Sequence, residues 1–216
     1  REAAREMGHD LKEASVVIMG ATGAIGSVGA AILAREARNM TLVARNQQKL
    51  EELAAKILDD TGLVVKITSD SKKALCGGDV VITVTSAVDT VIDPEDIKTG
   101  AVICDVARPR DVSKRVAEVR KDVLVIEGGV VEVPGDVNFN FNFGFPPGTA
   151  YACMAETMIL ALEKRYVSYT LGRDLTVKQV EEIDELIEAF NLGIHLHLLQ
   201  EVSRMLSIFV IIPAGF

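Results

Sequence analysis

Short apolar runs alternate with longer amphipathic stretches over the first two thirds of the chain. The runs are continuous and rich in valine and isoleucine, which is typical of strands that are covered on both faces. We predict six strands, at residues 15–19, 40–44, 64–68, 80–85, 101–105 and 123–127. Apolar spacings of three and four predict helices at residues 25–38 and 47–60, with shorter helical links at 72–75, 94–97 and 112–119. This alternation predicts the α/β class, with a doubly wound parallel sheet.

The pattern changes after residue 130. Asn and Phe alternate over residues 138–143, and a Gly- and Pro-rich segment follows at 144–148, which indicates an extended stretch and then a turn. We expect a long helix from Thr149 to about Tyr166 and a second helix over residues 177–190. We therefore divide the chain into a leading helix at 1–14, the sheet domain at 15–148 and a C-terminal helical segment at 149–216 that packs on the sheet.

Composition and charge narrow the class of partner. The chain has 23 Lys and Arg against 31 Asp and Glu, a net charge of −8, which argues against general binding to nucleic acid or to anionic membranes. No apolar stretch approaches the roughly 18 residues of a membrane span, and the charged start is unlike a signal peptide. The three cysteines form no CxxC pair, and no metal site is predicted. We expect a cytoplasmic protein that acts on a small molecule; a homo-oligomer stays open.

A glycine-rich segment follows the first predicted strand and opens the first long helix. Glycines at such a turn let the backbone approach a pyrophosphate, and the helix N-terminus supplies N–H donors and a positive dipole. Residues 15–148 are therefore expected to form a dinucleotide-binding Rossmann domain, although a merely structural glycine turn is the alternative. The candidate binding residues here are Gly20, Ala21, Thr22, Gly23, Ala24, Ile25 and Gly26.

The end of the second strand indicates which dinucleotide is bound. An NAD site usually has a carboxylate there to bind the ribose 2′-OH. Here Arg45 and Asn46 begin 19 residues after Gly26, and no carboxylate is present to repel a 2′-phosphate. An arginine can pair with that phosphate, so we predict NADPH, with Arg45 and Asn46 as its ligands. The alternative is that Arg45 is a solvated surface arginine.

The nicotinamide end should lie beyond the carboxyl ends of the later strands. Those ends carry residues 83–86, 105–109 and the pair Gly128 and Gly129. Small residues suit a flat ring that lies against the backbone, so Thr85, Ser86, Gly128 and Gly129 complete the predicted cofactor site. Ordinary loops are the alternative at each of these positions.

Cys153 is the candidate catalytic residue. Thr149 is a suitable N-cap, which would place the cysteine near the start of a helix, where the thiolate is favoured. Such a thiolate can accept an acyl group from a thioester, and a hydride can then reduce the enzyme-bound thioester to an aldehyde. The alternative is a small core residue, as we expect for Cys76 and Cys104.

Four segments together resemble the long-chain acyl-[acyl-carrier-protein] reductases of the cyanobacterial type, within the shikimate-dehydrogenase-like Rossmann proteins. They are residues 20–27, 44–46, 127–132 and 151–158. The resemblance implies that Cys153 is the acylated nucleophile, that NADPH donates the hydride and that a fatty aldehyde is formed. It also implies an acyl thioester of acyl carrier protein or coenzyme A as substrate. Family members carry an N-terminal domain that this chain lacks, so we expect it to be a piece of a longer protein.

Two rival functions remain. One is a shikimate- or amino-acid-type NADP-dependent dehydrogenase that reduces a carbonyl directly, with Cys153 inert. The other is a non-catalytic dinucleotide-binding module. Two further features bear on an acyl-carrier substrate: the Phe side of the Asn-Phe segment can line an acyl channel, and residues 108–122 hold six Lys and Arg against three acidic residues. Internal packing and a solvated face are the respective alternatives.

Overall fold

The computed structural model describes the 216-residue chain apart from residues 86–91, 134, 143, 170–174, 190–196 and 199–216. It contains two compact units, of which the first comprises Arg1–Glu127 and the second begins at Gly128. Within the described residues, the structure has no helix with the length and apolar character that crossing a membrane requires.

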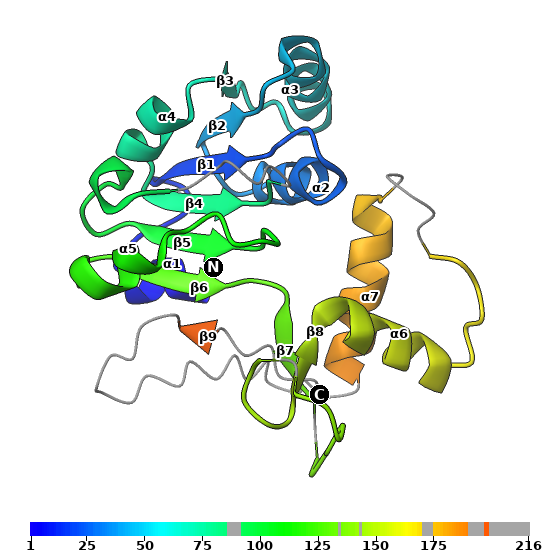
Figure 1. Cartoon of the computed structure of the whole chain (residues 1–216). Helices are drawn as coiled ribbons and strands as arrows, with labels where there is room; N and C mark the ends of the chain where they lie inside the picture. Colours follow the sequence, from blue (N-terminus) through cyan, green and yellow to red (C-terminus); the bar gives the residue numbers. More distant parts are fainter. Residues whose placement is uncertain (86–91, 134, 143, 170–174, 190–196, 199–216) are drawn as a thin grey trace. The chain divides into compact units, whose positions relative to one another are not determined.

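Six parallel strands build the sheet of the first unit (Figure 1). They are β1 (Ser15–Met19), β2 (Asn39–Val43), β3 (Lys66–Thr68), β4 (Val80–Thr83), β5 (Val102–Asp105) and β6 (Leu124–Glu127). Their order is β3-β2-β1-β4-β5-β6, and the two-residue strand β9 (His197–Leu198) follows β6. The order reverses between β1 and β4, which is where open α/β sheets bind their ligands. The predicted doubly wound sheet is confirmed.

Strand β1 is central because it is apolar on both faces. Val16, Val17 and Ile18 are at most 2% exposed, and β1 pairs in parallel register with β2 on one side and β4 on the other. A strand with two buried faces needs continuous apolar residues, and this explains why its ends match the predicted ones.

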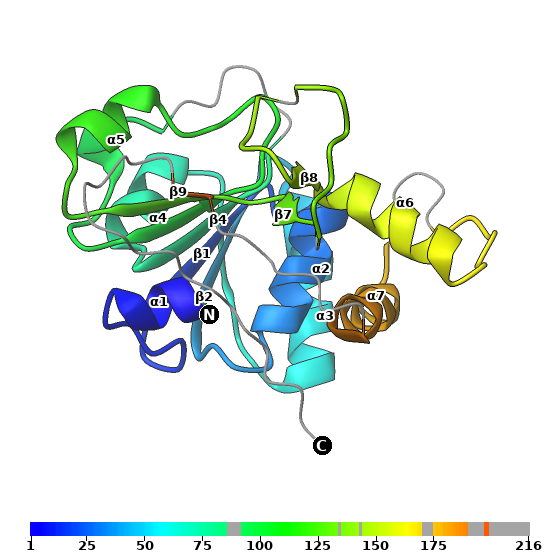
Figure 2. The same cartoon turned by 90° about the horizontal axis from the view of Figure 1, so that it is seen from below.

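Helices cover both faces of the sheet (Figure 2). On one face lie α1 (Glu2–Glu6), α2 (Ala24–Leu33) and α3 (Gln47–Thr61), which contribute Ala4, Ala30 and Leu50 to one core cluster. On the other face lie α4 (Ser71–Gly77), the 3-10 turn η1 (Pro94–Asp96) and α5 (Lys114–Val119), which contribute residues such as Leu75 and Val116 to a second cluster.

The predicted leading helix over residues 1–14 is wrong in extent. Helix α1 ends at Glu6, and Gly8 follows in the left-handed region with φ of 78°. A glycine there ends a helix readily because it has no Cβ to clash. Leu11 and Ala14 then pack into the core beneath a turn rather than along a helix.

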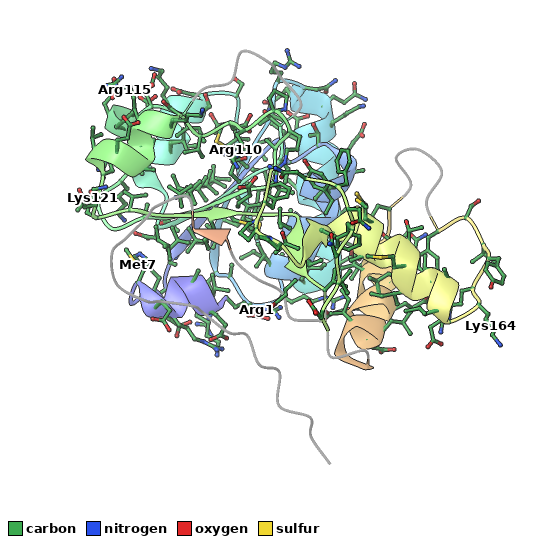
Figure 3. All side chains as sticks on the ribbon, turned by 60° about the horizontal axis from the view of Figure 1, so that its bottom comes forward. Arg1, Met7, Arg110, Arg115, Lys121 and Lys164 are labelled. Carbon is green, nitrogen blue, oxygen red and sulfur yellow. The ribbon has the colours of Figure 1, made fainter. Side chains whose placement is uncertain are left out.

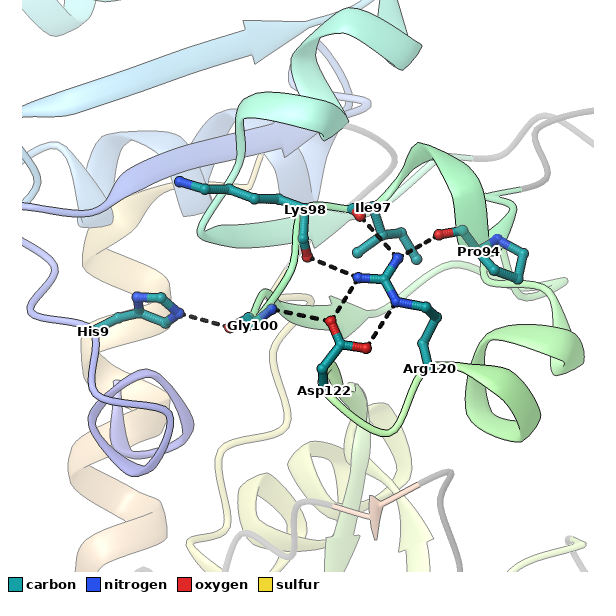
Figure 4. A network of polar contacts seen from close by, with 7 residues as sticks. All are labelled: His9, Pro94, Ile97, Lys98, Gly100, Arg120 and Asp122. Carbon is teal, nitrogen blue, oxygen red and sulfur yellow. Dashed lines mark hydrogen bonds and ion pairs between the residues drawn. The ribbon is translucent and has the colours of Figure 1, made fainter.

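Arg120 fixes the connections at the amino ends of the strands (Figure 4). Its guanidinium donates to the carbonyl oxygens of Pro94 at 2.5 Å, Ile97 at 2.9 Å and Lys98 at 3.3 Å. It also pairs with Asp122 at 2.8 Å, and these hydrogen bonds lower the pKa of Asp122 to about 2. One side chain thus holds the segment before β5 against the segment before β6.

The second unit pairs two short strands ahead of its helices. Strand β7 (Val130–Glu132) lies antiparallel to β8 (Thr149–Tyr151), with Val130 opposite Tyr151. Helix α6 (Ala152–Leu162) follows β8 directly, and α7 (Val177–Ala189) contacts α6. The predicted helix from Thr149 to Tyr166 is therefore shorter at both ends. The β7–β8 pairing also groups residues 128–148 with the C-terminal helices, whereas the sequence division placed the boundary after 148.

Candidate functional site

The glycine-rich turn packs so closely that two of its positions exclude any side chain. Gly20 has φ of +75°, and a Cβ there would lie 2.9 Å from the Val84 carbonyl oxygen. A Cβ on Gly26 would lie 2.3 Å from the Gly20 carbonyl oxygen. The Gly20 and Ala21 N–H groups both donate to the Val43 carbonyl, at 3.0 and 3.1 Å. The turn is therefore held between the ends of β1, β2 and β4.

Helix α2 begins with backbone donors that have no partner among the described residues. Gly23 is the N-cap and offers no side-chain acceptor. The N–H groups of Thr22, Ala24, Ile25 and Gly26 donate to no acceptor in the described part of the chain. Free donors at the positive end of a helix, beside glycines at positions 20, 23 and 26, fit the pyrophosphate of a dinucleotide.

Arg45 and Asn46 follow β2 and are both exposed. No ion pair involves Arg45 among the residues that the structure describes. Asn46 is the N-cap of α3, and its Oδ1 accepts the Lys49 N–H at 3.0 Å. The sequence interpretation missed this cap. Within the part of the chain that the structure describes, the amide NH2 of Asn46 and the guanidinium of Arg45 have no partner and can reach a ligand.

Thr85 lies just beyond β4 and bonds to a residue that the sequence analysis overlooked. Its hydroxyl donates to Asp111 Oδ1 at 2.7 Å, and the Thr83 hydroxyl donates to Asp111 Oδ2. Asp111 is 1% exposed. Ser86, the other candidate from this strand end, lies outside the described residues.

A second buried acid lies opposite Thr83. Asp105 ends β5 in register with Thr83 and is fully buried. Its carboxylate accepts the Ala107 and Val112 N–H groups, both at 3.0 Å. Burial raises the pKa of Asp105, and the charge of Asp111 acts in the same direction, against these two donors. The sequence signal for Asp105 is its place at the end of a predicted strand, whereas Asp111 stands in a charged stretch and has no such signal.

Glu127, the last residue of β6, forms ion pairs with two arginines of the basic stretch at residues 108–122. Its side chain is 4% exposed and pairs with Arg108 at 2.8 Å and Arg110 at 2.5 Å. Figure 3 shows Arg115 and Lys121 at the outer edge of the first unit, on the α5 side. Less positive charge is therefore uncommitted here than the sequence count indicates.

Gly128 and Gly129 form the turn that leads into β7. Gly129 has φ of 83°, and its carbonyl accepts the Ala152 N–H at 2.8 Å. Within the second unit, these two glycines therefore lie beside the start of α6. The structure brings them to the helix that carries the candidate nucleophile, and their predicted contact with the cofactor stays a prediction.

Cys153 is the second residue of α6 and is exposed. The N–H groups of Cys153 and Met154 donate to no acceptor within the described ranges. Thr149 is not the N-cap as expected: it lies in β8, and its hydroxyl donates to the Pro146 carbonyl at 2.6 Å. The helix begins at Ala152, and Cys153 therefore lies closer to its first residue than the predicted start at Thr149 implied.

The other two cysteines differ from each other. Cys76 is exposed near the end of α4. Cys104 lies within β5, where loss of solvation raises the pKa of its thiol to about 11, and the charge of Asp105 adds to this. Cys104 is thus a poor nucleophile at neutral pH, as expected for a structural residue.

The Asn-Phe segment borders a hollow in the second unit. Its volume is about 560 Å³, and Phe139, Phe141 and Phe145 are among its lining residues. Phe141 is 69% exposed, and Phe145 packs edge-to-face on Tyr151 with centroids 5.1 Å apart. Phe143 lies outside the described residues. An acyl-binding wall stays a prediction.

Comparison with known proteins bears on both units. The family model described as shikimate / quinate 5-dehydrogenase matches residues 1–127, the extent of the first unit. A long-chain acyl-[acyl-carrier-protein] reductase from Synechococcus elongatus is 30% identical over 191 residues, which are 85% of this chain and 54% of that protein. Aminotransferase PigE from a Serratia species is 34% identical over 177 residues, 80% of this chain and 20% of that protein. The chain thus spans about half of the first relative and a fifth of the second.

A solved structure with a similar fold is that of a dipicolinate synthase chain from Bacillus halodurans. It has a TM-score of 0.46 and 22% sequence identity, and the match covers 59% of this chain and 43% of that one.

Proposed function

Because the chain belongs to the shikimate/quinate 5-dehydrogenase family, we propose that its first unit holds NADPH and that the complete protein reduces acyl thioesters to aldehydes through Cys153. The first unit is an NAD(P)-binding Rossmann module of the dehydrogenase and reductase kind. The choice of NADPH, the thioester substrate and the covalent route are the proposal.

The observation that carries the proposal is the placement of Cys153. It is an exposed thiol in the first turn of a helix, beside two backbone N–H groups without acceptors among the described residues. An accessible thiol can be acylated by a thioester, and free N–H groups can stabilise an oxyanion. The match to the acyl-carrier-protein reductase adds support. It covers 85% of the chain, so the matched stretch includes residue 153 whether the unmatched residues lie at the amino end or at the carboxyl end.

Cys153 makes and breaks the bonds in this mechanism. Its thiolate attacks the thioester carbonyl carbon, the bond from that carbon to the carrier sulfur breaks, and the carrier leaves as a thiol after taking a proton. The N–H groups of Cys153 and Met154 can donate to the carbonyl oxygen as it becomes negative. NADPH, when bound, supplies a hydride. Cys153 would leave the acyl carbon as a thiolate when that hydride is added, and the acyl group would be released as an aldehyde.

The N–H groups of α2 and the cation of Arg45 would hold the cofactor. Among the described residues, the N–H groups of Ala24, Ile25 and Gly26 have no acceptor and would donate to the pyrophosphate, and the glycines of the turn would let it approach the backbone. Arg45 would pair with the 2′-phosphate. Asn46 would contribute its amide NH2, since its oxygen caps α3.

The test of the thioester route is the intact mass of the complete protein after incubation with palmitoyl-coenzyme A in the absence of NADPH. We expect a gain of one acyl group, mapped by peptide digestion to Cys153. Cys76 is the matched control, because it is also an exposed cysteine but is not in the first turn of a helix. Addition of NADPH should then remove the acyl group and yield the aldehyde. Acylation of Cys76 alone, or none, would contradict the covalent route.

Arg45→Ala tests the choice of cofactor. Loss of a charge-assisted contact costs about 1.5–3 kcal/mol, so the Kd for NADPH should rise roughly 10- to 100-fold while that for NADH stays unchanged. Arg38→Ala is the matched control, because Arg38 is exposed just before the amino end of the same strand. Titration calorimetry measures the Kd of the wild type and of both variants for NADPH and for NADH. An unchanged NADPH affinity in Arg45→Ala would make Arg45 a solvated surface residue.

Direct reduction of a carbonyl is the second candidate function. It is favoured by the family model, which is described as a dehydrogenase and matches only residues 1–127, without Cys153. Under this alternative the protein binds the dinucleotide but gains no acyl group. The mass experiment therefore separates the two candidates.

A further inference from the structure

Asp111 holds two hydroxyl groups in the interior of the first unit. It is 1% exposed, and each of its carboxylate oxygens accepts one threonine hydroxyl, from Thr83 and from Thr85. An ionised carboxylate only accepts hydrogen bonds, so both hydroxyls must donate, and their orientations are fixed. Thr83 is itself fully buried, so its hydroxyl has no contact with solvent.

The residue between these two threonines packs on the glycine turn. The Val84 N–H donates to the Met19 carbonyl at 3.1 Å. The Val84 carbonyl lies so close to Gly20 that a Cβ on that glycine would be 2.9 Å from its oxygen. Val84 therefore packs on the glycine turn, and the residues on either side of it, Thr83 and Thr85, are both bonded to Asp111.

Asp111 is in turn held by the main chain around it. Its carbonyl oxygen accepts the Ile92 N–H at 2.7 Å. The next residue, Val112, donates its N–H to the buried carboxylate of Asp105 at 3.0 Å. Asp105 lies opposite Thr83 in the β4–β5 register. The carboxylate of Asp111 thus occupies a defined place at the carboxyl ends of β4 and β5.

We propose that Asp111 is a positioning residue for the dinucleotide, which fixes the end of β4 against the glycine turn through the hydroxyls of Thr83 and Thr85. This rests on the proposed binding of NADPH by the first unit. The sheet order reverses between β1 and β4, so the dinucleotide lies across the ends of these strands. The adenosine half would then lie toward β2 and Arg45, and the nicotinamide half toward β4. Asp111 therefore acts on the nicotinamide half without touching it.

The test compares two ligands in the complete protein. NADPH spans the whole site, whereas adenosine 2′,5′-bisphosphate lacks the nicotinamide half. Asp111→Asn keeps the shape of the side chain but removes its charge, and its NH2 can only donate, so one of the two threonine hydroxyls must turn round to accept. We expect its Kd for NADPH to rise about tenfold and its Kd for adenosine 2′,5′-bisphosphate to stay within about twofold.

Thr83→Val provides a second variant in case Asp111→Asn does not fold. Valine has the shape of threonine without its hydroxyl, and because residue 83 is buried it cannot contact the ligand directly. We expect the same selective loss of NADPH affinity, restored in Thr83→Ser. Arg120→Ala is the control for general destabilisation, because it removes a polar network at the opposite ends of the strands. It should lower the melting temperature and leave the NADPH affinity unchanged.

The outcomes separate this inference from the proposed function. Wild-type affinity for NADPH in both Asp111→Asn and Thr83→Val would overturn the positioning role, as would an equal loss of affinity for both ligands. Wild-type protein that binds neither NADPH nor NADH would overturn both proposals. NADPH binding with the selective loss, but with no acyl group on Cys153, would leave the role of Asp111 standing and remove the thioester route.

Discussion

Replacement of Gly26 by alanine is expected to abolish dinucleotide binding. The new Cβ would lie 2.3 Å from the Gly20 carbonyl oxygen and 3.0 Å from the Ala21 Cα, and both are backbone atoms of the turn. A backbone cannot move aside as a side chain can, so the turn must open. We expect the Kd for NADPH to rise at least about 100-fold, or about 2.7 kcal/mol. Titration calorimetry measures this directly.

Gly29→Ala is the matched control for this prediction. Gly29 lies in the same helix, and a Cβ there would meet nothing within 4 Å. Alanine favours a helix interior over glycine by up to about 1 kcal/mol, so this variant should melt at a higher temperature and bind NADPH as the wild type does. Wild-type affinity for NADPH in both Gly26→Ala and Gly29→Ala would show that the glycine turn is not the cofactor site.

Replacement of Cys153 by serine is expected to remove thioester reduction and leave cofactor binding intact. Serine keeps the size of the side chain, but its hydroxyl is not ionised at neutral pH and is a weak nucleophile. In the complete protein, kcat/KM for NADPH oxidation with palmitoyl-coenzyme A should fall at least about a thousandfold. The Kd for NADPH should not change, because the proposed cofactor ligands at the glycine turn and Arg45 are untouched.

Cys76→Ser provides the control for Cys153→Ser. Both residues are exposed, but Cys76 lies near the end of α4 and Cys153 lies at the start of α6. Activity should be retained in Cys76→Ser. Full activity in Cys153→Ser as well would place the chemistry elsewhere and favour direct reduction of a carbonyl.

Most of the sheet of the first unit could be predicted from the sequence because its inner strands are local signals, whereas the partly buried β3 begins at Lys66 and not at the predicted residue 64. A strand buried on both faces must be apolar at every position, and β1 over Ser15–Met19 shows this most clearly. The β7–β8 pair could not be predicted in this way. Val130–Glu132 and Thr149–Tyr151 have three residues each, and each needs the other as a partner across a long Gly- and Pro-rich connection.

The same distinction between local sequence signals and contacts with distant residues applies to the candidate site. Gly20, Gly26 and Arg45 stand at fixed distances from predicted strands, so their places could be read from spacing. Asp111 has no such signal, because it stands among charged residues that predict a solvated surface. It is buried only because the chain after β5 returns over the ends of β4, and this is a tertiary contact.

The position of Cys104 gives the sheet an internal reporter of its own opening. This cysteine lies in β5 with Ile82 and Ile126 as its register partners. Because loss of solvation raises the pKa of its thiol to about 11, little thiolate is present at pH 7 while β5 is in place. Separation of the strand restores an ordinary thiol. An alkylating reagent should therefore modify the half-buried Cys104 more slowly than the exposed Cys76, and its rate should rise when β5 separates from its neighbours.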